Sequence, residues 1–225
     1  MLTKTNQADL PNVFDQQKEH DQLNHIKEEI GALAKKLAAN GKEVLAQKGF
    51  SKEQQDIFEE MFQKCFVSTA DTTTKLLPNE ETYVFTGDIE AMWLRDSSAQ
   101  VVHYLPFAKT VPQIGRMIYG FIKRQMRYIG IDPYANAFNE EANGHCWEKD
   151  DTDSNDWEWE RKYEIDSLCY PLWLLHAYYE KTQDARVFSA ETKTAFRRIL
   201  DTWKTEQRHD VDSSYYFRRV NCPPT

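Results

Sequence analysis

The residues most able to do chemistry in this chain lie between residues 86 and 100, in the stretch TGDIEAMWLRDSSAQ. Trp93, Arg95 and Asp96 occur within four consecutive positions, and Asp88 precedes Asp96 by eight. Arginine offers a planar fork of donors and aspartate can accept two hydrogen bonds, so the pair can bind vicinal sugar hydroxyls. A tryptophan adds a flat apolar wall for the C–H face of a pyranose. The structural alternatives are that Asp96 caps the following helix and that Arg95 pairs with a nearby acid.

A second polar and aromatic stretch lies between about residues 130 and 165, before an apolar helix. Its candidates for ligand binding are Asn136, Lys162 and Asp166. We expect all three to face the same cavity as the first stretch, because each stretch places aromatics, a cation and carboxylates at the start of a helix. Long connections of this kind are usually functional. The alternatives are a turn residue for Asn136, a surface counter-ion for Lys162 and a helix cap for Asp166.

The acidic run in the second stretch is a candidate calcium loop. Asp151, Asp153 and Asn155 occupy alternate positions, as at the start of an EF-hand. However, Asp156 stands where the loop requires glycine, and Lys162 stands where it requires glutamate. We therefore interpret the run as a solvated surface loop. The sequence also lacks HExxH, GxSxG, GxGxxG and a phosphate-binding glycine loop, so we predict neither a metal nor a cofactor.

Bulk composition limits the class of protein and its partners. The chain has 225 residues with a formal net charge of -8 and a pI of about 5.3, which argues against nucleic acid as a partner. Its apolar runs are much shorter than the roughly 18 residues of a membrane span, and its N-terminus has no apolar signal core. Four separated cysteines without a CxxC pair favour reduced thiols in a cytoplasmic protein.

The elements that position both stretches are predicted to be helices, because apolar residues recur at intervals of three and four. A capping box begins the second helix at Ser51, the third helix starts near Asp96, and the fourth starts at about Pro112. Pro171 is expected in the first turn of the fifth helix, and Gly41 and Gly49 are expected to loosen the end of the first. The predicted apolar faces span residues 23–37, 57–66, 101–105, 114–129, 168–179 and 196–203. Only TYVFTG, at residues 82–87, has convincing strand character.

Four longer motifs carry a resemblance to a known family: TGDIEAMWLRDSSAQVVHYLPF, IDPYANAFN, WERKYEIDSLCYPLWL and FRRVNCPPT. From about residue 55 to Thr225, the chain resembles family 125 glycoside hydrolases, which are bacterial exo-α-1,6-mannosidases. The resemblance implies an all-α (α/α)6 barrel that acts without metal and removes terminal α-1,6-linked mannose with inversion, for example from N-glycan oligosaccharides. It also implies that Arg95 and Asp96 bind hydroxyls of the terminal mannose and that Trp93 shapes that subsite.

The resemblance further predicts how much of the family's domain the chain contains. Family members are about twice as long, and the barrel needs twelve helices, whereas about six are predicted here. We therefore expect residues 1–225 to be the N-terminal part of a single truncated domain that covers about half of the toroid. The family's general acid and base fall outside these motifs, so no catalytic residue is assigned. Such a chain is not expected to hydrolyse mannosides at a useful rate.

Two alternative functions stay open. The first is a helical module that binds a carbohydrate or a partner without catalysis, which mannose binding without hydrolysis would favour. The second is a different enzyme on an (α/α) toroid, such as another glycosidase or a polysaccharide lyase. The acidic candidate pocket disfavours the lyase, because it would repel a uronate.

Overall fold

The computed structural model describes residues 13–221, with side chains from residue 17 onward, and these residues are mostly helical. The α-helices are α1 (Val13–Gln47), α2 (Lys52–Thr72), α3 (Leu94–Val101), α4 (Pro112–Ile131), α5 (Ile165–Thr182), α6 (Ala190–Glu206) and α7 (His209–Asp212). Short 3-10 helices are η1 (Pro78–Glu80), η2 (Val102–Phe107) and η3 (Ala185–Val187). The strands are β1 (Thr74–Leu77), β2 (Glu81–Val84), β3 (Met92–Trp93), β4 (Ala137–Phe138) and β5 (Glu158–Glu160). The all-α fold class predicted from the sequence is confirmed. In the described residues, no helix is both long and apolar enough to cross a membrane.

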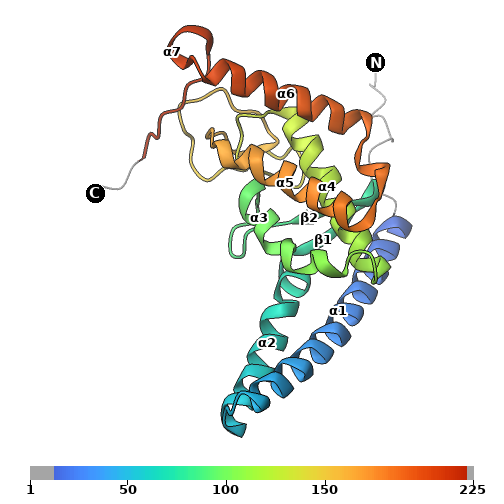
Figure 1. Ribbon diagram of the computed structural model, residues 1–225. Helices are drawn as coiled ribbons and strands as arrows, with labels where there is room; N and C mark the ends of the chain where they lie inside the picture. The colour runs from blue at the N-terminus through green and yellow to red at the C-terminus, as the bar shows by residue number, and fades with distance from the viewer. Residues whose placement is uncertain (1–12, 222–225) are drawn as a thin grey trace.

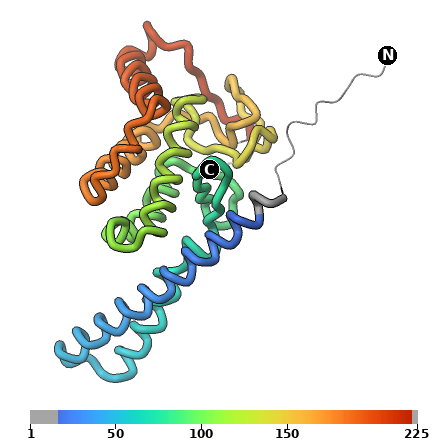
Figure 2. The backbone as a smooth tube through the Cα atoms, turned by 90° about the vertical axis from the view of Figure 1, so that its right-hand side faces the viewer, coloured from blue at the N-terminus to red at the C-terminus, as the bar shows by residue number. Residues whose placement is uncertain are grey.

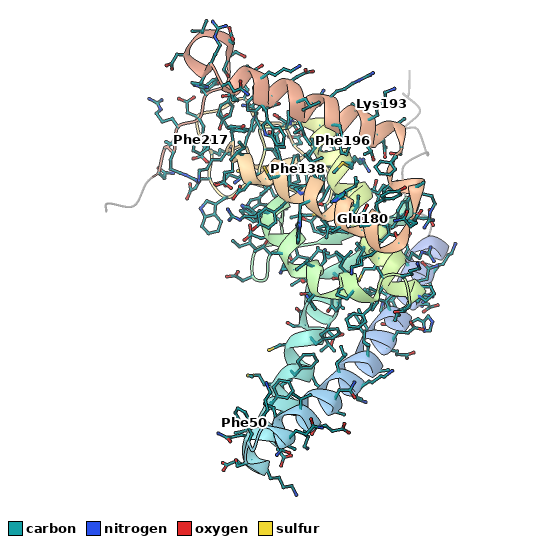
Figure 3. The ribbon with its side chains drawn as sticks, in the orientation of Figure 1. Phe50, Phe138, Glu180, Lys193, Phe196 and Phe217 are labelled. Atoms are coloured by element: carbon teal, nitrogen blue, oxygen red, sulfur yellow. The ribbon has the colours of Figure 1, made fainter. Side chains whose placement is uncertain are left out.

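Helices α1 and α2 form an antiparallel pair that projects away from the other elements (Figures 1 and 2). Phe50 lies at the far end of this pair, whereas Phe138 lies in the main body (Figure 3). The prediction that Gly41 loosens the end of the first helix is wrong, because α1 continues to Gln47. A Cβ on Gly41 would lie 2.5 Å from the Phe58 ring, so glycine is the residue that lets the two helices approach.

The capping box at Ser51 is confirmed, but the apolar face predicted for the second helix is partly wrong. Ile57 and Met61 are 58% and 57% exposed. The face that packs in the structure contains Phe62 and Phe66, as predicted, together with Phe58, and their neighbouring ring centroids are 5.7 and 5.5 Å apart. Apolar residues occur on both sides of α2, so the periodicity alone did not show which side is buried.

Helix α4 is at the centre of the main body and is the element that the sequence predicted best. It starts at Pro112 as expected, and its buried residues recur along its whole length. The strand predicted at residues 82–87 corresponds to β2, which pairs antiparallel with β1. This hairpin packs on α4 at Gly120, where a Cβ would lie 2.5 Å from the carbonyl oxygen of Glu80. The sequence did not predict β1, or the antiparallel sheet with strand order β3-β4-β5.

Two predictions for the remaining helices are wrong in detail. Pro171 is the seventh residue of α5, counted from Ile165, and lies beyond the first turn. Leu200, in the predicted apolar face of the sixth helix, is 53% exposed on α6. The third helix begins at Leu94, two residues before Asp96, which agrees with the prediction, and it continues into η2. Each of these details depends on which neighbouring elements the helix packs against.

Candidate functional site

Arg95 is the centre of the candidate site, which lies where the N-termini of α3 and α5 meet. Its Nη1 donates to Asp166 Oδ2 over 2.9 Å, and its Nη2 donates to Asp96 Oδ2 over 3.3 Å. The hydrogen bond with Asp166 raises the pKa of Arg95. The three side chains are 36% to 40% exposed, so a ligand can reach them. We call Arg95, Asp96 and Asp166 the Arg95 cluster.

Neither aspartate of the Arg95 cluster caps its helix. Trp93 is the N-cap residue of α3 and Glu164 is that of α5, and neither N-cap makes a side-chain capping bond. The capping alternative for Asp96 and Asp166 is therefore wrong, although acids in a first turn still interact favourably with the helix dipole. The Oδ1 atom of Asp166 is buried and has no hydrogen-bond partner, so a strong acceptor is left unused within the cluster.

The start of α3 is held rigidly from two sides. On one side β3 pairs with β4, with Trp93 opposite Ala137. On the other side the fully buried Gln125 of α4 donates to the Leu94 carbonyl over 3.0 Å and to the Ser98 hydroxyl over 2.7 Å. Trp93 itself is half-buried at this junction. The position of Arg95 is thus fixed by elements on both sides of it in the sequence.

Asn136 does not face an open cavity, contrary to the prediction. It is only 1% exposed, its Nδ2 donates to Glu160 Oε2 over 2.7 Å, and its Oδ1 accepts from the Lys162 backbone N–H over 3.3 Å. Its carbonyl accepts from the Leu94 N–H over 3.0 Å. Protein groups thus satisfy both ends of the Asn136 side-chain amide, so this amide is not left for a ligand. The contribution of Asn136 is instead to hold the backbone at the start of α3.

The Lys162 ammonium lies 3.0 Å from Glu164 Oε1 and is 44% exposed, which agrees with the surface counter-ion alternative. Glu164 is the N-cap residue of α5 and acts on Arg95 through its charge. Lys162 thus contacts Glu164, which lies near the Arg95 cluster, but it makes no hydrogen bond to any of the three cluster residues.

The interpretation of the acidic run as a solvated loop holds for Asp153 and Asp156, which are exposed. It fails for Asp150, whose side chain is 6% exposed. It also fails at the end of the run, where Glu158 is 3% exposed and the Glu160 side chain is 9% exposed. Burial raises the pKa of Glu158 to about 8, and the neighbouring Asp132 adds to this effect. In residues 13–221, no group of three or more His, Cys, Asp or Glu side chains has a metal-binding arrangement.

Sequence reasoning missed two arginines that neutralise these acids. Arg161 pairs with Asp132 over 2.7 Å, and Arg219 pairs with both Asp150 and Glu160. Arg161 and Arg219 lie 58 positions apart in the sequence, and only the fold brings them to the same acidic loop. The sequence around each arginine did not indicate this role; the available signal lay in the acidic loop, where several acids would need a cation if they were buried.

A large cleft in the described residues lies elsewhere. It has a volume of about 590 Å³ between α1 and the β1–β2 hairpin, and its lining includes Lys75, Glu81, Arg124 and Glu140. None of the six predicted site residues lines it. We therefore place the candidate site at the Arg95 cluster, where an unused buried acceptor and exposed charged groups coincide.

Comparisons with known proteins show the family to which the chain belongs. The family described as metal-independent alpha-mannosidase (GH125) matches residues 55–225. A Streptococcus pneumoniae metal-independent alpha mannosidase, solved as a non-productive complex with alpha-1,6-mannobiose, is 40% identical with a TM-score of 0.73. The aligned region covers 83% of this chain and 43% of that one. The meiotically up-regulated gene 157 protein of Schizosaccharomyces pombe is 32% identical over 164 residues, which are 68% of this chain and 32% of the yeast protein.

This chain thus spans less than half the length of either relative. The family match nevertheless covers most of it and includes every residue of the Arg95 cluster. The chain therefore belongs to the metal-independent α-mannosidase family, glycoside hydrolase family 125.

Proposed function

We propose that the Arg95 cluster binds the terminal non-reducing mannose of an α-1,6-linked mannoside, in an enzyme that hydrolyses this linkage with inversion. The observation that carries the proposal is the buried, unpartnered Oδ1 of Asp166 beside an arginine that bridges two exposed carboxylates. Family membership and the related bacterial enzyme in complex with alpha-1,6-mannobiose support this substrate class.

Each member of the cluster has a distinct role in this proposal. Asp96 and Asp166 accept the protons of sugar hydroxyls, and Arg95 donates to the hydroxyl oxygens. Charge-assisted bonds of this kind are short and are stronger than bonds between neutral groups. Trp93, at the N-cap of α3, forms part of the wall beside the sugar ring.

The cluster supplies binding rather than proton transfer. Both carboxylates accept hydrogen bonds from Arg95, so we assign them to accept hydroxyl protons and not to donate one. Inverting hydrolysis requires a separate acid and base, with their carboxyl groups about 6.5–9.5 Å apart to admit a water. In this proposal that pair lies outside the Arg95 cluster, and the cluster places the glycosidic bond relative to it.

The test is Asp96→Ala in the protein as its gene encodes it, assayed on α-1,6-mannobiose. Loss of a charged hydrogen-bond partner costs about 1.5–3 kcal/mol, which corresponds to roughly a tenfold to hundredfold fall in kcat/KM. The matched control is Asp88→Ala, which removes an exposed carboxylate from the same loop and should leave kcat/KM unchanged. A D96A variant with near wild-type kcat/KM and normal melting would show that the sugar-binding role is wrong.

Linkage and stereochemistry are tested separately. Rates on α-1,2-, α-1,3- and α-1,6-mannobiose show whether the α-1,6 linkage is preferred. Proton NMR of the first product formed distinguishes β-mannose, which inversion predicts, from α-mannose, which retention would give. Binding of mannose without turnover of any of the three disaccharides would instead support a recognition module.

A further inference from the structure

The backbone N–H of Leu94, at the start of α3, is hydrogen-bonded to the second stretch at Asn136. The Asn136 carbonyl accepts from the Leu94 N–H over 3.0 Å, and the Asn136 N–H donates to the Glu160 carbonyl over 3.2 Å. Its side-chain Oδ1 accepts from the Lys162 N–H over 3.3 Å. Because Leu94 directly precedes Arg95, a displacement of Asn136 moves the backbone that carries the cluster.

The orientation of Asn136 depends in turn on Glu160 and Arg219. Glu160 Oε2 accepts from Asn136 Nδ2 over 2.7 Å, and Glu160 Oε1 accepts from Arg219 Nη2. Arg219 Nη1 also lies 3.2 Å from Asp150 Oδ2. Arg219 lies two positions after Phe217, which Figure 3 shows beside the loops of the second stretch. One guanidinium thus neutralises two carboxylates whose side chains are only 9% and 6% exposed.

We propose that Arg219, acting through Glu160 and Asn136, is a positioning residue for the Arg95 cluster. Without the Arg219 guanidinium, the carboxylates of Glu160 and Asp150 are two largely buried like charges that repel each other. Glu160 is the member of this pair that holds Asn136, so the repulsion is transmitted to Leu94 and to the cluster. The proposal rests on the sugar-binding role of the cluster, but its geometric part can be tested independently of that role.

The experiment compares Arg219→Met with Arg218→Met in the protein as its gene encodes it. Arg218 is the adjacent residue, its side chain is 77% exposed, and it pairs with Asp151 on the surface. We expect R219M to lower kcat/KM for α-1,6-mannobiose by about tenfold or more, measured well below its melting temperature, because small displacements in a site are costly. We expect R218M to leave kcat/KM unchanged.

A second substitution, made in the R219M background, is expected to raise the activity rather than to lower it. Glu160→Gln removes one of the two repelling charges and keeps an oxygen that can accept from Asn136. The double variant should therefore recover part of the activity lost in R219M. Contacting residues of this kind are expected to show such non-additive effects. A double variant with activity equal to or lower than that of R219M would overturn the proposed route through Glu160.

Amide hydrogen exchange at Leu94 provides the readout that does not need activity. In R219M the Leu94 amide should exchange faster, whereas in R218M it should not change. A lower melting temperature with unchanged Leu94 exchange and unchanged kcat/KM would make Arg219 a stabilising residue only, and would overturn the proposal. If R219M does not fold, Arg219→Lys, which keeps the charge but not the fork, should show faster Leu94 exchange. If the wild-type protein hydrolyses no mannoside, the proposed function fails, and Leu94 exchange alone decides this inference.

Discussion

Arg124 of α4 connects three elements of the main body, and its replacement by methionine should be strongly destabilising. Its side chain is 4% exposed; Nη1 donates to Glu81 of β2, and Nη2 donates to the Glu140 carbonyl after β4. Its guanidinium carbon also lies 4.7 Å from the ring centroid of Tyr128. In R124M the carboxylate of Glu81, which is 5% exposed, keeps the longer hydrogen bonds of 3.3 and 3.4 Å from Arg127.

The expected cost follows from this geometry. Removing one partner of a buried ion pair typically costs about 3–5 kcal/mol, because the other charge stays buried and poorly compensated. Arg127 compensates part of this loss, so we expect about 3 kcal/mol, a large share of the roughly 5–15 kcal/mol that stabilises a typical domain. Arg127→Met is the matched control, because its side chain is 35% exposed and its contact is long; it should cost about 1 kcal/mol or less.

The assay is equilibrium urea unfolding of both single variants and of the double variant Glu81→Gln/Arg124→Met. The double variant should be more stable than R124M, because it contains no uncompensated buried carboxylate. Equal costs for R124M and R127M would refute the reasoning. So would a double variant in which the separate costs of the two substitutions simply add.

Two further predictions concern stability. Gly120→Ala should cost about 1–3 kcal/mol, because the new Cβ would lie 2.5 Å from the Glu80 carbonyl oxygen, whereas Gly130→Ala in the same helix meets no atom within 4 Å. In thermal unfolding G130A should be neutral or stabilising, and equal losses for both alanines would contradict the packing argument. The pKa of Glu158 is raised to about 8 from 4.5, so the folded state binds the proton more tightly, and the associated stability is present below pH 4.5. This contribution to stability is lost as the pH rises to about 8. Glu158→Gln should therefore flatten the dependence of the unfolding free energy on pH between 4.5 and about 8. An unchanged pH dependence in this variant would contradict the raised pKa of Glu158.

The sequence by itself determined the features that depend on neighbours within one or two turns. The capping box at Ser51 and the start of α4 at Pro112 are local interactions between residues a few positions apart. The periodicity of apolar residues predicted mostly helical elements in the same way. The stretch around Arg95 was recognisable because its unusual residue types are adjacent in the chain.

Only the tertiary structure decided how distant segments combine. Arg95 and Asp166 are 71 positions apart, and they meet because α3 packs beside α5. Asn136 has a side chain that could bind a ligand, but it is buried beside β4, which pairs with β3 and β5. Its amide is satisfied by Glu160 and by the Lys162 backbone. Arg219 carried no local signal, because its role depends on two carboxylates that lie about 60 to 70 positions earlier in the chain. Whether a polar side chain contacts ligand or protein is set by which elements cover it, and that is a property of long-range packing rather than of local sequence.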